Sequence, residues 1–110
     1  MKHINKLIVV GLLSLSSNVF AIPTSDKLID QIGIQGLSPD EIVITNLAGW
    51  GAAGCEKARH VILGASVNNR QEMLSVALAA KMAQKVVRFY GNCDTSNGDD
   101  RFNATYIIVK

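Results

Sequence analysis

The spacing of hydrophobic and polar positions predicts three strands in the first half of the chain. Residues 28–35 (LIDQIGIQ) alternate imperfectly, residues 41–48 (EIVITNLA) form a β-branched run, and residues 58–64 (ARHVILG) resemble a third strand. Short runs of this kind, bounded by turn-forming residues, are typical of strands. The turns between them fall at 36–40 (GLSPD) and at 49–54 (GWGAAG), where glycines tolerate the positive φ angles of tight turns.

The second half of the chain predicts one helix followed by two strands. Asn69 is a favourable N-cap residue, and Glu72 three positions later completes a capping-box pattern. Residues 73–84 then supply strong helix formers. Residues 86–93 (VVRFYGNC) return to alternation, and after a polar loop residues 101–110 (RFNATYIIVK) predict the last strand.

The resulting order, β-β-β-α-β-β, predicts a mainly β fold with one helix. Five strands with a helix between the third and the fourth are the elements of the OB-fold, a small Greek-key barrel. If residues 28–35 do not form a strand, a four-stranded α+β sandwich is the alternative.

The start of the chain, residues 1–21, has the pattern of a secretory signal peptide. Lys2 and Lys6 give it a basic start, and residues 7–15 form a largely apolar run that is too short to span a bilayer. Cleavage after the signal leaves 110 − 21 = 89 residues, 22–110, which is one small domain. We therefore expect a periplasmic or secreted protein.

Charge narrows the range of partners. The whole chain has 11 basic and 9 acidic residues, and removing Lys2 and Lys6 leaves nine of each. A domain without net charge lacks the positive electrostatic potential that attracts nucleic acids and anionic membranes. No second long apolar stretch follows the signal, so no membrane span is expected.

Cys55 and Cys93 are the two cysteines, and both lie in the exported part. In an oxidising compartment an even pair in a small domain predicts a disulfide, which would also fasten the glycine-rich turn at 49–54. A zinc site built from both cysteines with His60 and Asp94 is the alternative, but its CxxC or HxxxH spacing is missing.

The predicted helix is unusually apolar for a surface helix. Its apolar positions fall on two faces, Leu74, Ala77, Leu78 and Met82 on one and Met73, Val76, Ala80 and Ala83 on the other. One face can cover the end of the barrel, and the second would stay exposed unless a partner covers it. We expect the second face to be an oligomer interface, although a merely alanine-rich, helix-favouring surface explains it too.

The search for catalytic chemistry finds little, so we do not expect an enzyme, a cofactor or a metal. His60 is the only histidine after the signal, and no nucleophile or zinc-protease motif surrounds it. Asp99 and Asp100 lack the spacing of a calcium-binding loop. The glycosylation sequon at Asn103 lies in a predicted strand and is taken as chance.

Binding remains the expected activity. OB-type barrels bind oligonucleotides or oligosaccharides on the sheet face, and export without net charge favours the sugars. Arg88, Tyr90 and Asn92 share one face of a predicted strand, where a ring and polar groups suit a glycan. Trp50 with Asn46 is a second candidate, and packing at the rim of the barrel is the alternative role for Tyr90 and Trp50.

The residues also resemble a known family. IVIT at 42–45 is followed by a cysteine, an alanine-rich helix and VVRFYGN at 86–92. This succession resembles the B (binding) subunits of subtilase-cytotoxin and pertussis-like AB5 toxins, or small exported bacterial relatives of them, over roughly residues 40–92. The resemblance implies an exported OB-type subunit that forms a ring of five, with the helices at its centre, and binds host glycans. It also makes a catalytic A subunit a candidate partner.

Two departures from that pattern concern the glycan site. The sialic-acid-binding members carry a serine where this chain has Asp40, with Ser38 two residues away, so both are further candidate contacts. Their binding tyrosine falls at the place of Gly91. The alternative function is an exported protein-interaction or inhibitory module that binds no sugar.

Overall fold

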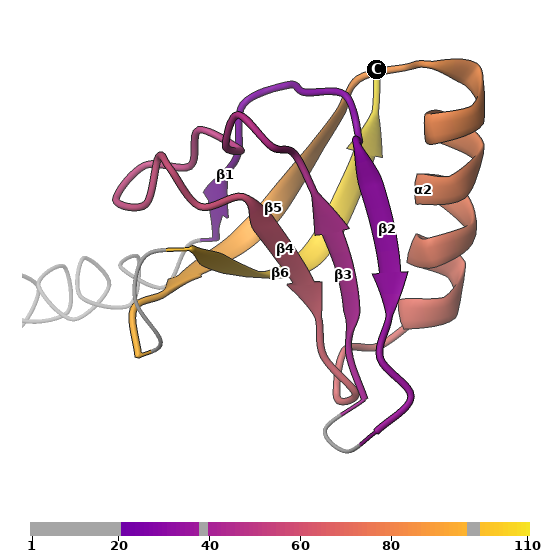
Figure 1. Cartoon of the computed structure of the whole chain (residues 1–110), viewed down its shortest axis with the longest axis horizontal. Coiled ribbons are helices and arrows are strands. Elements are labelled where there is room, and N and C mark those ends of the chain that lie inside the picture. The colour runs from indigo at the N-terminus through magenta and orange to yellow at the C-terminus, as the bar shows by residue number, and fades with distance from the viewer. Residues whose placement is uncertain (1–20, 38–39, 97–99) are drawn as a thin grey trace, which may run out of the picture.

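The computed structural model describes residues 21–37, 40–96 and 100–110 (Figure 1). The expected signal peptide lies outside the described residues except for Ala21, and so does Ser38.

The described part of the chain is mainly β with one helix, which confirms the expected class. Its elements are β1 (Ile22–Pro23), β2 (Gln31–Ile34), β3 (Ile42–Thr45), β4 (His60–Leu63), α2 (Arg70–Ala83), β5 (Val87–Asp94) and β6 (Arg101–Val109). Each of the five expected strands overlaps an observed strand, and the expected helix overlaps α2. The additional strand, β1, has two residues, which is too short for an alternating pattern to reveal.

The strands form one mixed sheet in the order β1-β5-β6-β4-β3-β2 (Figure 1). All neighbouring pairs are antiparallel except β4 and β6, which are parallel. The sheet is open, with β1 and β2 as its edges, so the expectation of a closed barrel is wrong. The two edge strands pair with β5 and with β3 and not with each other, so no ladder between β1 and β2 closes the sheet. A four-stranded sandwich is wrong as well, since residues 31–34 do form a strand.

The segment between β1 and β2 nevertheless bonds to both sides of the sheet. Lys27 and Val87 exchange two backbone hydrogen bonds, of 3.0 and 2.8 Å. Three residues later, the N–H of Asp30 donates to the carbonyl oxygen of Thr45 at 2.9 Å. This segment therefore runs from the β5 side of the sheet to the β3 side.

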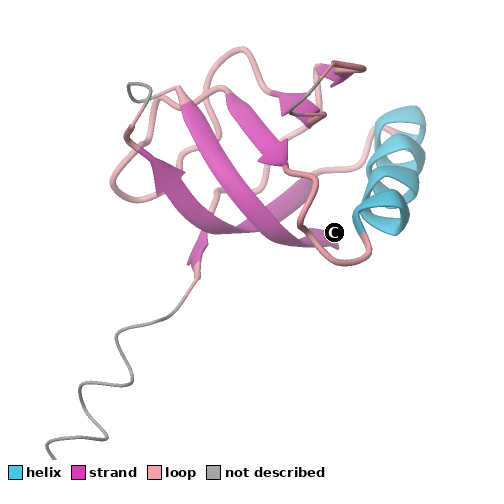
Figure 2. Ribbon diagram, turned by 90° about the horizontal axis from the view of Figure 1, so that it is seen from below, coloured by secondary structure: helices cyan, strands magenta, loops and turns pink. Residues whose placement is uncertain are grey.

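The core lies between the inner face of the sheet, the loop from β3 to β4 and helix α2, which runs alongside the sheet (Figures 1 and 2). Its largest fully buried side chains are Trp50, Phe89, Phe102, Ile44, Leu63, Val61 and Val87. The helix contributes one buried stripe, made of Met73, Leu74, Ala77 and Ala80.

Helix α2 begins without the expected capping box. Asn69 has a left-handed backbone, with φ 58°, and its side chain makes no capping hydrogen bond. An N-cap side chain reaches the first-turn amides from an extended backbone, so the left-handed conformation removes that contact. Asparagine tolerates this conformation better than most residues, and the side-chain amide of Asn69 makes no capping hydrogen bond among the described residues.

Candidate functional site

The outer face of β5 and β6 carries the expected cluster. Arg88, Tyr90 and Asn92 alternate with the buried positions of β5 and therefore share its outer side. The antiparallel register adds Tyr106 of β6 directly opposite Tyr90. The two tyrosine rings lie with centroids 5.5 Å apart and planes inclined by 59°, and Tyr106 is 56 % exposed. We call these four residues the β5–β6 face.

Arg88 is held in place on this face. Its Nε donates to Oδ1 of Asp26 at 2.8 Å, and its Nη1 donates to the hydroxyl of Tyr90 at 3.4 Å. The hydrogen bond to Tyr90 and then the bond and charge of Asp26 raise the pKa of the Arg88 guanidinium. Sequence reasoning missed Asp26 and Tyr106. Alternation from the buried Phe102 and Ala104 would place Tyr106 inward, and only the shift in register between β5 and β6 turns it outward. Nothing in the sequence around Asp26 predicted its contact.

A bulge shapes the middle of this face. The pairing of β5 with β6 shifts between Tyr90 and Gly91, which leaves Thr105 as the extra residue of β6. A Cβ at Gly91 would overlap the backbone oxygen of Asn103 and lie 2.7 Å from Cα of Ala104. Gly91 is therefore required by close backbone contact, and no side chain fits where the resembling toxin subunits carry a tyrosine.

A pocket of about 230 Å³ opens beside this face, between the start of α2 and β6. Tyr106 belongs both to its wall and to the tyrosine pair. Asn68, Asn69, Glu72 and Thr105 line the pocket with polar groups. We call it the α2–β6 pocket; it was not foreseen, because it depends on how the helix is placed against β6.

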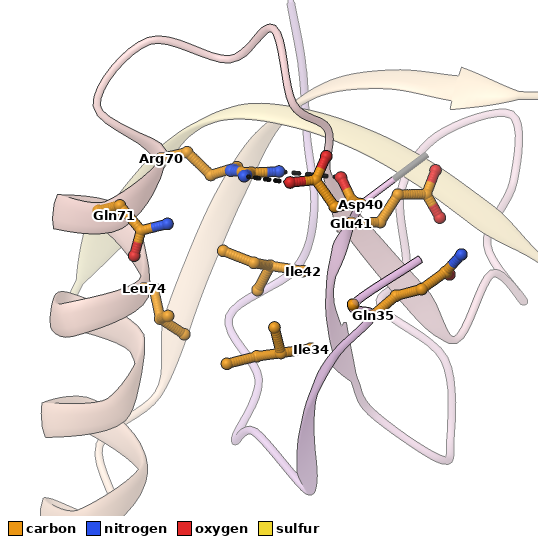
Figure 3. A pocket seen from close by; sticks show the side chains of 9 residues that line it. Ile34, Gln35, Asp40, Glu41, Ile42, Arg70, Gln71 and Leu74 are labelled. Carbon is orange, nitrogen blue, oxygen red and sulfur yellow. Dashed lines mark hydrogen bonds and ion pairs between the residues drawn. The ribbon is translucent and has the colours of Figure 1, made fainter. Parts of the chain in front are cut away.

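Asp40 lines a different pocket, of about 250 Å³, at the ends of β2 and β3 that approach α2 (Figure 3). Arg70 points at Asp40 there, and its Nη1 and Nη2 donate to the backbone oxygen and Oδ2 of Asp40 at 2.9 and 3.3 Å. Ile34, Ile42 and Leu74 form its apolar wall. Asp40 is thus already paired in this pocket, and the two pockets share no lining residue.

Trp50 lies in the core, which corrects the expectation that it contacts a ligand. The side chain is fully buried, and its ring meets Phe89 edge-on at a centroid distance of 5.1 Å. Its Nε1 donates to the carbonyl oxygen of Ile44 at 3.2 Å. Asn46, expected beside it, is also buried, and its amide donates to the carbonyl oxygen of Leu28 at 2.8 Å.

The two apolar faces of the helix are arranged differently from the expectation. Met73 and Ala80, expected at an oligomer interface, are buried against the sheet. Val76 and Ala83 are exposed, as expected. Leu78 and Met82, expected to cover the core, are instead 44 % and 86 % exposed. The orientation of α2 on the sheet therefore buries two residues of each predicted face and leaves the other two exposed.

The disulfide is confirmed, since Cys55 and Cys93 are bonded to each other. Cys55 lies in the loop between β3 and β4, and Cys93 lies near the end of β5. Gly54 beside it has a φ of 90°, as expected for a tight turn. Bonded sulfurs are not thiolate ligands, so the alternative zinc site is wrong. Within residues 21–37, 40–96 and 100–110, no group of three or more metal-ligating side chains is present.

His60 belongs to a polar network on the outer side of β4. Its Nδ1 lies 2.9 Å from Oγ1 of Thr45, and its Nε2 lies 3.5 Å from Oδ2 of Asp100. Arg59 binds Asp100 through Nε and Nη2, at 3.1 and 2.8 Å. The side-chain hydrogen bonds from Arg59 are the main reason that the pKa of Asp100 is lowered to about 2. The network ties the start of β4 to the start of β6; Asp99, considered with Asp100, lies outside the described residues.

The comparisons with known proteins give no relative for this chain. No family model, no curated protein and no solved structure matches it. Within the described part of the chain, no helix is long and apolar enough to cross a membrane. The resemblance to AB5 toxin B subunits therefore remains a prediction.

Proposed function

We propose that this chain is an exported, disulfide-bonded binding domain of the OB type that recognises a glycan through the β5–β6 face. The observation that carries the proposal is the tyrosine pair, Tyr90 and Tyr106, next to an arginine that two partners hold in place. A tyrosine offers an apolar ring and a polar hydroxyl, which together suit a sugar ring with its hydroxyl groups. Arg88 and Asn92 add donors along the same strand.

The order of the strands supports the OB type. Strands β2, β3 and β4 follow one another as antiparallel neighbours, and α2 separates them from β5 and β6. The segment between β1 and β2 bonds to both β5 and β3, and an open sheet linked in this way is compatible with the partly open Greek-key barrel of the OB-fold. Export is supported by the disulfide, because such bonds persist in oxidising compartments.

Glycan binding is tested with the oxidised protein on a glycan array, followed by titration of the best ligand. Tyr90→Ala and Tyr106→Ala are each expected to weaken binding about tenfold, because each removes a ring at the centre of the face. Leu47→Ala, in the exposed loop after β3, is the matched control and leaves binding unchanged. Binding that both tyrosine variants retain would contradict the proposal, provided that their melting temperatures match that of the parent.

The exposed apolar side chains of α2 favour an additional interaction with protein. Leu78 and Met82 lie one turn apart on the helix and remain outside the core. We propose that another copy of the chain covers them, in a ring of five if the domain assembles as the resembling toxin subunits do. An A subunit or another protein partner on this surface is the alternative, and it would suit an interaction or inhibitory module without sugar binding.

Native mass spectrometry at micromolar concentration tests this self-association. We expect an assembly larger than one chain, which Met82→Glu converts to monomer because it places a charge in an apolar contact. Lys81→Glu is the matched control, since Lys81 is an exposed neighbour on the same helix. A monomer in the parent protein would remove the ring and direct attention to a different protein partner.

A further inference from the structure

We propose that the α2–β6 pocket binds one neutral pyranose unit, adjacent to the unit that stacks on the tyrosine pair. The inference rests on the proposed glycan binding and names the part of the ligand that gives specificity. Tyr106 connects the two places, because it lines the pocket and also packs against Tyr90. A glycan lying on the β5–β6 face therefore extends into this pocket without a break.

The size of the pocket fits a single sugar ring. Sites for drug-sized ligands enclose about 300–1,000 Å³. The α2–β6 pocket encloses about 230 Å³, which limits it to a smaller group. Its apolar wall is formed by Met73, Val76 and Ile107, against which the C–H groups of a sugar ring can pack.

The polar groups around that wall are uncommitted. The side chains of Asn68, Asn69, Glu72 and Thr105 make no hydrogen bond with other side chains or backbone among the described residues. The Asp40 pocket differs in this respect, because its arginine is already bound to Asp40. Amides, a carboxylate and a hydroxyl together both donate and accept, as sugar hydroxyls require.

The open edge of β6 adds backbone groups to the pocket. Strand β4 pairs with β6 only as far as Asn103, so the later part of β6 has no strand on that side. The N–H and C=O of Val87 both bond to Lys27, so those of Arg88 face β6. The alternation of an antiparallel ladder then directs the N–H and C=O of Ile107, which neighbours the partner of Arg88, toward the α2 side.

Charge selects a neutral sugar. Glu72 is the only charged residue that lines the pocket, and no lysine or arginine lines it. A carboxylate in a small site repels a second carboxylate, and this repulsion would have to be offset by a cation that the lining lacks. Acidic sugars are therefore disfavoured in the α2–β6 pocket.

The test is an amide-resolved NMR titration of the oxidised protein with galactose, glucose, N-acetylglucosamine and, as the acidic comparison, N-acetylneuraminic acid. We expect at least one neutral sugar to shift the amides of Asn69, Glu72 and Ile107, and to bind at least fivefold more weakly to Asn69→Gly. Glycine keeps the left-handed backbone of Asn69 and removes only the side chain. Gln84→Gly is the matched control, because Gln84 has the same backbone conformation at the other end of α2 and is expected to leave the affinity unchanged.

The outcomes separate this inference from the proposed function. Binding that Tyr90→Ala weakens but Asn69→Gly retains would overturn the pocket and leave the β5–β6 face standing. Preference for the acidic sugar at the shifted amides would also overturn the inference. If no glycan on the array and no sugar in the titration binds, both proposals fail together.

Discussion

Replacing Trp50 with alanine is expected to lower the free energy of unfolding by about 4 kcal/mol. The side chain is fully buried, so the substitution leaves a large cavity between the β3–β4 loop and Phe89. It also leaves the carbonyl oxygen of Ile44 without the indole donor. The expected mature domain, residues 22–110, would have a total stability of about 9 kcal/mol, so urea unfolding should show a loss of nearly half.

Trp50→Phe separates the two causes of this loss. Phenylalanine fills most of the volume but lacks the N–H group, so we expect a smaller loss, about 2 kcal/mol, from the reduced volume and the missing hydrogen bond. Leu47→Ala in the same loop is the exposed control and should change stability by less than about 0.5 kcal/mol. A Trp50→Ala variant as stable as the control would contradict the core role. Unchanged glycan binding by a folded Trp50→Phe variant would agree with it.

The local pattern predicts this fold better than it predicts the closure of the sheet. The β-branched run before Thr45 and the leucine- and alanine-rich run after Arg70 each satisfy one periodicity, and both became the expected element. The open sheet depends instead on which strand the segment around Lys27 pairs with, and that choice is made by contacts between residues about 60 positions apart. Such contacts leave no periodic signal in one sequence.

The same distinction applies to the candidate site. Alternation alone places Arg88, Tyr90 and Asn92 together, because the period of a strand is fixed. Predicting that Tyr106 joins them requires the register of β5 with β6, and predicting the α2–β6 pocket requires the position of helix α2 against β6. The sequence identifies Trp50 as a candidate contact residue but does not decide its role, because the same ring can stack on a ligand or fill the core.

Both predictions about the apolar faces of helix α2, one face buried and the other exposed, are only partly correct. Positions three and four apart form an apolar stripe around Leu74 and another around Met73, and both stripes consist of apolar residues alone. The sheet buries Leu74 and Ala77 from the first stripe and Met73 and Ala80 from the second, so each predicted face is divided. Leu78 and Met82 remain exposed as a result, and they are the residues that the self-association experiment probes.

The second large effect is expected from removal of the disulfide. The Cys55→Ser, Cys93→Ser variant should unfold with a free energy lower by about 4 kcal/mol, because the bond closes a loop of 93 − 55 = 38 residues and limits the unfolded chain. In a domain of this size such a loss corresponds to a melting temperature lower by about 20 °C. Intact mass with and without reductant provides the starting point, since the oxidised protein must gain two hydrogens on reduction.

The bond acts on the same loop that holds Trp50. Cys55 follows Trp50 by five residues, and both precede the start of β4, so releasing Cys55 from Cys93 frees one attachment of the segment that seats the indole ring. The two substitutions should therefore be coupled, and combining them should cost less than the sum of about 8 kcal/mol if the loop has already loosened. Strict additivity would show instead that the core contact with Phe89 holds Trp50 independently of the disulfide. Two free thiols in freshly exported protein, or a double serine variant as stable as the parent, would contradict the stabilising role of the bond.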